Sequence, residues 1–377
     1  MTLRISSIFD GGNIACLDCS DPGNIRLEIA KDERTGFYQW FYFRLSGAAG
    51  KDCRLRLMNA GGSSYPEGWA DYRAVASEDR RTWTRVETSY EDPVLTLRHR
   101  PSSDSIYFAY FAPYSMERHA DLIAWAQGSP RAGLRVLGAT LDGQDMDLLQ
   151  IGEPGEGKRV CWIVARQHAG ETMAEWWMEG FLHRLLDEAD PLAREVLRRA
   201  VLYVVPNMNP DGSRRGHLRG NAMGTDLNRQ WQSPSLEVSP EVFLVKREME
   251  ATGVDFCLDV HGDEVRHFNY LIGPDGIPGW SERLGGLFED YKRALKTANP
   301  DFQVGPGYPV PGPGRANLTM CGTYNAETYD CLSMTLEMPF YDTLETPNQA
   351  FGWSPERSRK LGAANLDALA SVLERLR

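Results

Sequence analysis

The chain has 377 residues, of which 42% are hydrophobic, and it carries a formal net charge of −11. This length allows two domains of ordinary size, whereas the negative charge argues against general binding to nucleic acid. No segment is long and apolar enough to span a membrane, and residues 1–10 lack the apolar core and cleavage site of a signal peptide. The seven cysteines are an odd number without framework spacing. We therefore expect a soluble cytoplasmic protein with neither a nucleic-acid nor a membrane partner.

Residues 1–115 have the pattern of an all-β domain. Short runs rich in aromatic and β-branched residues are separated by Gly, Pro, Asp and Ser, and they occur at residues 38–44, 53–57, 82–87, 94–98 and 106–111. Several short strands at this spacing are typical of a β-sandwich. We expect most of the aromatic side chains to lie in its core.

Residues 116–377 have a different pattern, in which strands alternate with helices. Apolar runs predict strands at residues 160–165, 201–205, 256–260 and 332–337, and helices are predicted at residues 172–186 and 357–376. Residues 304–314 are too rich in Gly and Pro for regular structure and predict a loop. This alternation indicates an α/β layer.

Polar side chains follow or end four of these predicted strands. His168 follows the first strand, Asn207 and Asn209 follow the second, His261 follows the third and Glu337 ends the fourth. In open α/β sheets ligands bind beyond the carboxyl ends of the strands. These four strand ends therefore predict one functional site.

His168 and Glu171 fall in a tight turn between the first strand and the helix that follows it. Such a turn can direct an imidazole and a carboxylate at one point, and zinc accepts this pair as two of three protein ligands. His261 is the natural third ligand, because the distant ligand of a catalytic zinc site comes from another part of the chain.

At this point the sequence resembles the M14 family of zinc metallocarboxypeptidases. The matching residues are His168-Ala-Gly-Glu171, Asn209-Pro-Asp-Gly212, Asp226-Leu-Asn-Arg229 with Trp231, His261, and Glu337 in Thr335-Leu-Glu337. The resemblance covers residues 116–377 and implies a carboxypeptidase-like α/β catalytic domain with a mixed sheet flanked by helices. The aromatic region before it, over residues 1–115, looks like the N-terminal domain of the cytosolic carboxypeptidase branch.

The resemblance also implies the chemistry of the site. His168, Glu171 and His261 would bind one Zn²⁺ per chain. Glu337 would be the general base, with Glu264 the next candidate.

Three further residues match family positions around the metal and the reacting carbonyl. Asp226 resembles the carboxylate that orients His168. Arg219 matches the arginine that stabilises the oxyanion. Tyr308 matches the tyrosine that closes over the substrate, with Tyr324 as its competitor.

Substrate recognition follows from three more positions. Asn228 and Arg229 would hold the terminal carboxylate of the substrate. Arg315 falls near the position at the pocket base that sets side-chain preference, where an arginine would favour acidic C-terminal residues.

Three functions are compatible with these residues. The first is a zinc carboxypeptidase that releases acidic residues, glutamate above all, from the C-terminal tails of peptides or proteins. The second is a zinc amidohydrolase acting on an acyl amino acid or a cell-wall peptide. The third is a non-catalytic binding module for acidic tails, although the complete set of metal ligands and the base argue against it.

Overall fold

Two five-stranded sheets form the N-terminal part of the chain in a computed structural model that describes residues 2–304 and 307–377. One sheet has the order β1 (Arg4–Ser6), β4 (Tyr42–Ser46), β10 (Ser105–Ala109), β6 (Val75–Ser77) and β7 (Thr84–Arg85). The other has the order β2 (Ala15–Asp18), β3 (Ile25–Glu28), β5 (Cys53–Leu57), β9 (Val94–His99) and β8 (Glu87–Glu91). Side chains from both sheets share one hydrophobic core. The predicted β-sandwich is therefore confirmed.

Two of the predicted strand runs differ from the observed ones. Residues 82–87 do not form one strand, because the chain passes from β7 to β8 and these strands belong to different sheets. The change occurs at buried Val86, whose N–H bonds to Ala74 outside either sheet. Residues 38–41 precede β4 and are irregular, since Tyr38 and Gln39 bond to residues 64 and 65 rather than to a neighbouring strand.

The second part of the chain contains a seven-stranded mixed sheet. Its order is β11 (Ala132–Ala139), β12 (Asp145–Ile151), β14 (Ala200–Val205), β13 (Arg159–Ala165), β15 (Phe256–Asp263), β17 (Leu332–Pro339) and β16 (Tyr270–Ile272). The four strands β14, β13, β15 and β17 are parallel, and the outer strands pair antiparallel.

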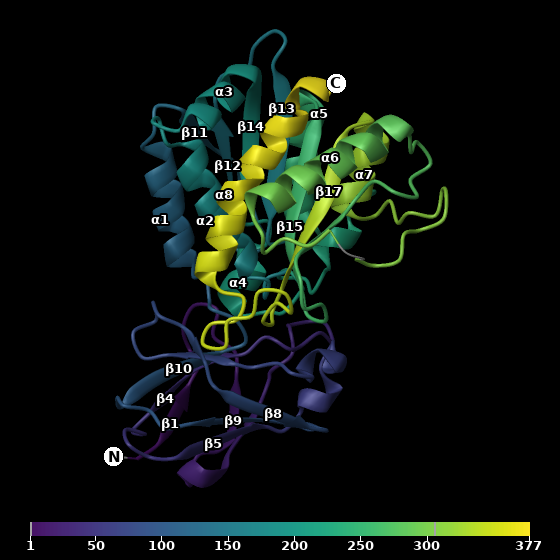
Figure 1. Ribbon diagram of the computed structural model, residues 1–377. Helices are drawn as coiled ribbons and strands as arrows, with labels where there is room; N and C mark the ends of the chain where they lie inside the picture. Colours follow the sequence, from purple (N-terminus) through teal and green to yellow (C-terminus); the bar gives the residue numbers. More distant parts are fainter. Residues whose placement is uncertain (1, 305–306) are drawn as a thin grey trace.

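Helices cover both faces of this sheet (Figure 1). One face packs against α1 (Met116–Gln127), α2 (Met173–Leu185), α3 (Pro191–Arg199), α6 (Glu282–Ala298) and α8 (Pro355–Val372). The other packs against α5 (Pro240–Thr252) and α7 (Cys321–Tyr329). Strand β13 supplies both cores because its side chains alternate, with Ile163 on the first face and Trp162 and Val164 on the second.

The remaining helices are short. Helix α4 (Pro210–Arg215) lies near the junction of the two parts in Figure 1. Single 3₁₀ turns are found at Pro22–Asn24, Ala60–Gly62, Pro66–Trp69, Leu227–Arg229 and Leu373–Arg375. In the described ranges no helix has both the length and the apolar character needed to cross a bilayer. Of the predicted loop at residues 304–314, residues 305 and 306 lie outside the described part, and the rest forms neither helix nor strand.

The carboxyl ends of the central strands face the N-terminal β-domain. Tyr341, two residues after β17, donates its hydroxyl proton to the Glu264 carbonyl beyond β15, 2.6 Å away, and also contacts the Gly68 carbonyl of the β-domain. We propose a domain boundary at residue 115, because β10 ends at Ala109 and Ser115 caps α1. The carboxyl ends of the strands, where the sequence predicts a functional site, therefore face the N-terminal domain.

Two glycines allow α2 and α8 to pack closely on the covered face. A Cβ atom at Gly180 in α2 would lie 2.0 Å from the Arg359 carbonyl oxygen, and one at Gly362 in α8 would lie 2.0 Å from that of Trp177. Both neighbours are backbone atoms, so neither can move away without separating the helices.

Gly180→Ala is therefore expected to lower the free energy of unfolding by about 1–3 kcal/mol through overpacking. Gly286→Ala is the matched control, because Gly286 lies exposed in α6 with nothing near its Cβ position. That change should raise stability by up to about 1 kcal/mol through helix propensity. Urea unfolding measures both, and equal stability of the two variants would contradict the packing argument.

Candidate metal and catalytic site

Three donor side chains converge where β13 and β15 end. His168 and Glu171 lie in the turn between β13 and α2, and His261 lies within β15. Glu171 places one oxygen 2.6 Å from His168 Nδ1 and the other 2.8 Å from His261 Nδ1. The donor atoms of the three buried residues lie within 4.8 Å of one another. Two imidazoles and one carboxylate are the donor set of many catalytic zinc sites, so these residues fit the expected ion.

Each histidine presents its second ring nitrogen to a carboxylate. His168 Nε2 lies 3.0 Å from Asp226, and His261 Nε2 lies 2.9 Å from Asp259. Such partners fix the orientation and the tautomer of a ligating histidine. The sequence predicted the Asp226 contact but missed Asp259. Its signal was its place two residues before His261, on the same face of one strand.

A buried chain of hydrogen bonds supports Asp259. The side-chain NH₂ group of Gln167 donates to the Asp259 carboxylate over 2.7 Å, and Trp231 donates its indole N–H to the side-chain oxygen Oε1 of Gln167 over 2.8 Å. Trp231 therefore acts in the site through two other side chains, which gives a physical role to a residue that the sequence pattern singled out.

Glu337 is brought to the donor cluster by strand register. It lies opposite His261 where β15 and β17 pair. Burial raises the pKa of its carboxyl well above the ordinary value, and the nearby Glu171, Asp263 and Glu264 raise it further, whereas His261 opposes them. Its Oε2 atom has no hydrogen-bond partner among the described residues. Glu337 lines the cavity, although this oxygen is itself buried.

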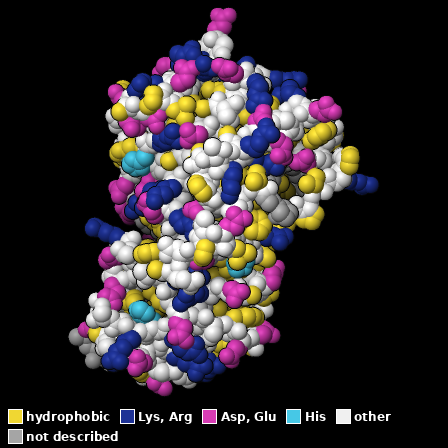
Figure 2. Space-filling model, viewed as in Figure 1, with side chains coloured by type: hydrophobic (Ala, Val, Ile, Leu, Met, Phe, Trp, Pro, Cys, Tyr) yellow, Lys and Arg dark blue, Asp and Glu magenta, His cyan; other side chains and the backbone are white. Residues whose placement is uncertain are grey.

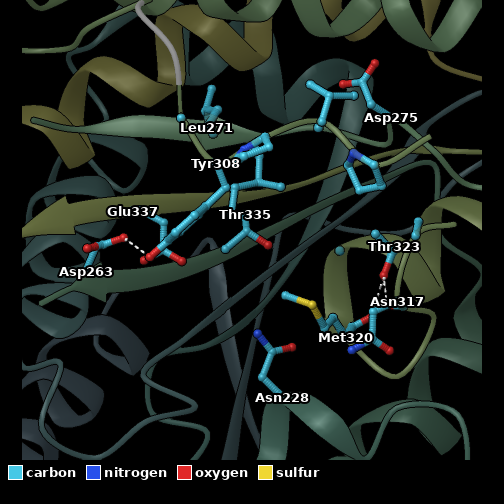
Figure 3. A pocket seen from close by; sticks show the side chains of 18 of the residues that line it. Asn228, Asp263, Leu271, Asp275, Tyr308, Asn317, Met320, Thr323, Thr335 and Glu337 are labelled. Atoms are coloured by element: carbon cyan, nitrogen blue, oxygen red, sulfur yellow. Dashed lines mark hydrogen bonds between the residues drawn. The ribbon is translucent and has the colours of Figure 1, made fainter. Parts of the chain in front are cut away.

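The cavity in front of these groups has a volume of about 1010 Å³. Tyr308 lies across it beside Glu337, with its hydroxyl directed at Asp263 (Figure 3) and 2.7 Å from the carboxylate. Tyr270 donates to the same Asp263 oxygen over 2.5 Å. Tyr324 does not line the cavity, because it lies in α7 and packs toward Trp231. Of the two candidate tyrosines, only Tyr308 is placed where a substrate would lie.

Arg219 lies at the wall of the cavity, with its side chain 11% exposed. Its Nε donates to Asp226 over 2.9 Å, and its Nη1 donates to the Tyr65 hydroxyl over 2.9 Å. Burial alone would lower the pKa of Arg219, but the nearby Asp226 and Tyr65 outweigh it and the pKa is raised. Its Nη2 makes no hydrogen bond in the described part of the chain. One donor is therefore left for a ligand. Tyr65 comes from the β-domain, and no sequence signal indicated it.

The three residues expected to recognise substrate also line the cavity. Asn228 is buried, and its amide oxygen accepts the Cys321 N–H over 2.8 Å. Arg229 and Arg315 are exposed and have no ion-pair partner within the described residues. Arg315, which was expected near the base of the pocket, lies exposed in its Gly/Pro-rich loop.

Family models match both parts of the chain. The model described as the cytosolic carboxypeptidase N-terminal domain matches residues 5–111, and the one described as zinc carboxypeptidase matches residues 121–248. Among solved structures, a metallo-carboxypeptidase from Pseudomonas aeruginosa, in complex with (2-guanidinoethylmercapto)succinic acid, is 43% identical. The match has a TM-score of 0.97 and covers 99% of this chain and 100% of that one.

Two relatives extend the comparison. An uncharacterised protein of Zymomonas mobilis is 51% identical over 376 residues, which cover 100% of this chain and 98% of the relative. Mouse cytosolic carboxypeptidase 1 is 29% identical over 65% of this chain, and the match spans only 24% of that longer protein. With the site geometry described above, these matches establish that the chain belongs to the M14 family of zinc carboxypeptidases, in its cytosolic carboxypeptidase branch, and is a metallocarboxypeptidase.

Proposed function

We propose that this metallocarboxypeptidase depends on one Zn²⁺ held by His168, Glu171 and His261, and that it releases acidic residues from C-terminal tails. The observation that carries the proposal is the convergence of these three donors beside Glu337, at a cavity that His168, Glu171 and Glu337 line. When bound, zinc supplies a Lewis acid for the scissile carbonyl and lowers the pKa of water. The names of the cytosolic relatives support a cytoplasmic location.

Glu337 is the general base of this proposal. Its place on the cavity wall supports the role, because a base must reach the proton that it removes. The same carboxyl then delivers the proton to the leaving amine. Burial raises the pKa of this carboxyl, which favours the protonated form that this second step needs.

Arg219 and Tyr308 act on the reacting end of the substrate. The free Nη2 of Arg219 would donate to the oxygen on which negative charge develops, and fixed donors of this kind contribute strongly to catalysis. Tyr308 would close over the substrate by exchanging its bond with Asp263 for one with the peptide.

Recognition of the C-terminal residue uses the two arginines of the cavity wall that lack ion-pair partners. Arg229, next to Asn228, would bind the terminal carboxylate through its planar fork. Arg315 would bind a side-chain carboxylate. Lys292 also lines the cavity, but its ammonium group already forms an ion pair with Glu289 over 2.5 Å.

A second specificity, for basic C-terminal residues, also has an observation in its favour. Asp275 lines the same cavity and forms no ion pair within the described part. The Pseudomonas relative binds a ligand whose name contains both a guanidino group and succinic acid. The peptide experiment below therefore includes a basic residue.

The zinc assignment predicts one Zn²⁺ per chain and its loss in His168→Ala. Removing one of three protein ligands opens the site, so elemental analysis after dialysis should find little zinc in the variant. His183→Ala is the matched control, because His183 is exposed on α2 and stacks on Trp125 away from the site. Equal zinc in wild type and His168→Ala would refute the assignment.

Glu337→Gln should retain zinc and fold but lose about 10²–10⁴-fold in kcat, because the isosteric amide cannot accept the proton. Glu289→Gln, which changes another glutamate of the cavity wall, should keep near-normal turnover. Steady-state kinetics with elemental analysis compares the two variants. Near-normal turnover in Glu337→Gln would place the base elsewhere, with Glu264 next.

Acidic specificity predicts the highest kcat/KM for peptides ending in Glu, against otherwise identical peptides ending in Leu or Arg. Arg315→Ala should lose about 10-fold of the Glu-to-Leu ratio, since a bond to a charged group contributes roughly 1.5–3 kcal/mol and exposure reduces it. Lys292→Ala is the control and should keep the ratio.

The remaining outcomes of the peptide series are equally informative. A wild-type preference for Arg would replace the acidic specificity with the basic one. Equal cleavage of a peptide with an amidated C-terminus would favour the amidohydrolase function. An unchanged ratio in Arg315→Ala would remove this residue from recognition.

A further inference from the structure

The β-domain holds the backbone on both sides of Arg219 through one buried carboxylate. One oxygen of Asp32 accepts the Leu218 N–H over 2.6 Å, and the other accepts the N–H groups of Arg219 and Gly220 over 2.8 and 2.9 Å. Three successive amides that converge on an anion form a nest, which fixes the local backbone. The loop of residues 216–220 therefore takes its conformation from a residue of the other domain.

Further contacts hold the same loop against the β-domain. Asn13 donates its amide to the Gly216 carbonyl over 2.9 Å, and the Glu33 N–H donates to His217 Nε2 over 3.2 Å. Gly216 has a φ of +72°, and a Cβ there would lie 2.7 Å from the carbonyl oxygen of Gly11. Only glycine permits this approach of the two backbones without strain.

The side chain of Arg219 is held from the β-domain as well. Tyr65 accepts the Nη1 proton, and Phe37 places its ring 5.8 Å from the guanidinium. Gln39 fixes the Tyr65 backbone by accepting its N–H over 2.8 Å and donating to its carbonyl over 3.1 Å. Asp226 of the catalytic domain holds Nε from the other side.

We propose that the N-terminal β-domain is part of the active site, with Asp32 and Tyr65 as positioning residues for Arg219. Asp32 sets the backbone from which the arginine projects, and Tyr65 holds one arm of the guanidinium so that Nη2 points to the reacting carbonyl. Donors that are fixed before the reaction stabilise developing charge without reorganising. This inference rests on the proposed role of Arg219 in catalysis.

Tyr65→Phe is the sharper test, because it removes one hydroxyl whose bond is to Arg219. We expect kcat to fall about 10-fold, as for loss of a bond to a charged group, with KM, zinc content and Tm nearly unchanged. Tyr38→Phe is the matched control, since this hydroxyl donates to Asn59 within the β-domain. Its kinetics should equal those of the wild type.

Asp32→Asn should lower kcat at least as much, because an amide NH₂ group would face the backbone N–H donors. The Leu218 carbonyl of the same loop also accepts the Gly170 N–H over 2.8 Å. Gly170 lies between the proposed metal ligands His168 and Glu171, so a change in this loop could also affect metal binding, and zinc content is measured in parallel. Asp79→Asn is the control, because Asp79 likewise accepts two backbone amides but lies at an exposed turn. If Asp32→Asn does not fold, Tyr65→Phe still decides the proposal.

A double-mutant cycle separates positioning from a general structural role. Arg219→Ala should lower kcat about 10²–10³-fold, and adding Tyr65→Phe should then cost nothing more, because the hydroxyl acts through the arginine. A normal kcat in Tyr65→Phe, or an additive loss in the double variant, would overturn the inference and leave the proposed function intact. A normal kcat in Arg219→Ala would refute the catalytic role of Arg219 and the inference with it.

Discussion

The carboxylate of Glu171 lies between two imidazole nitrogens in a fully buried environment, and the rest of the site depends on this arrangement. Burial alone would raise the pKa of Glu171, but His168 and His261 outweigh it and lower the pKa. Buried polar groups are expensive unless every member of the network has partners. Asp226 and Asp259 meet this requirement at the outer nitrogens of the two rings, so each imidazole is held at both ends.

Several carboxyl groups lie close together around the donor cluster, and their mutual repulsion affects the pKa values of Glu264 and Glu337. Burial raises the pKa of Glu264 well above its ordinary value, and the nearby Glu171 adds to the rise while Arg219 opposes it. Glu337 is affected in the same sense. A divalent cation among the three donors would offset this excess, which gives an electrostatic reason for the zinc that the family implies. On the face shown in Figure 2, acidic and basic side chains are interspersed over both domains.

The two domains meet at the candidate site. Asp32 and Tyr65 contact Leu218 and Arg219, and Gly68 contacts Tyr341. Sites built on rigid elements and supported by a second layer of contacts hold their geometry most precisely. Here the β-sandwich supplies part of that layer.

The local sequence pattern was enough to predict a large part of the fold and of the candidate metal site. Alternating and helical periodicities located the strands and helices, and the turn after β13 brought His168 and Glu171 together because residues three apart in such a turn are neighbours. What the sequence could not determine depends on contacts between distant segments. The opposition of His261 and Glu337 is a matter of strand register. The contacts of Asp32 and Tyr65 with Arg219 require the docking of one domain on another. The exposure of Arg315 follows from the path of a loop whose sequence has no periodicity that would predict it. Local spacing sets which side chains can act together within a turn or strand, whereas only the packed tertiary structure decides which distant residues surround them.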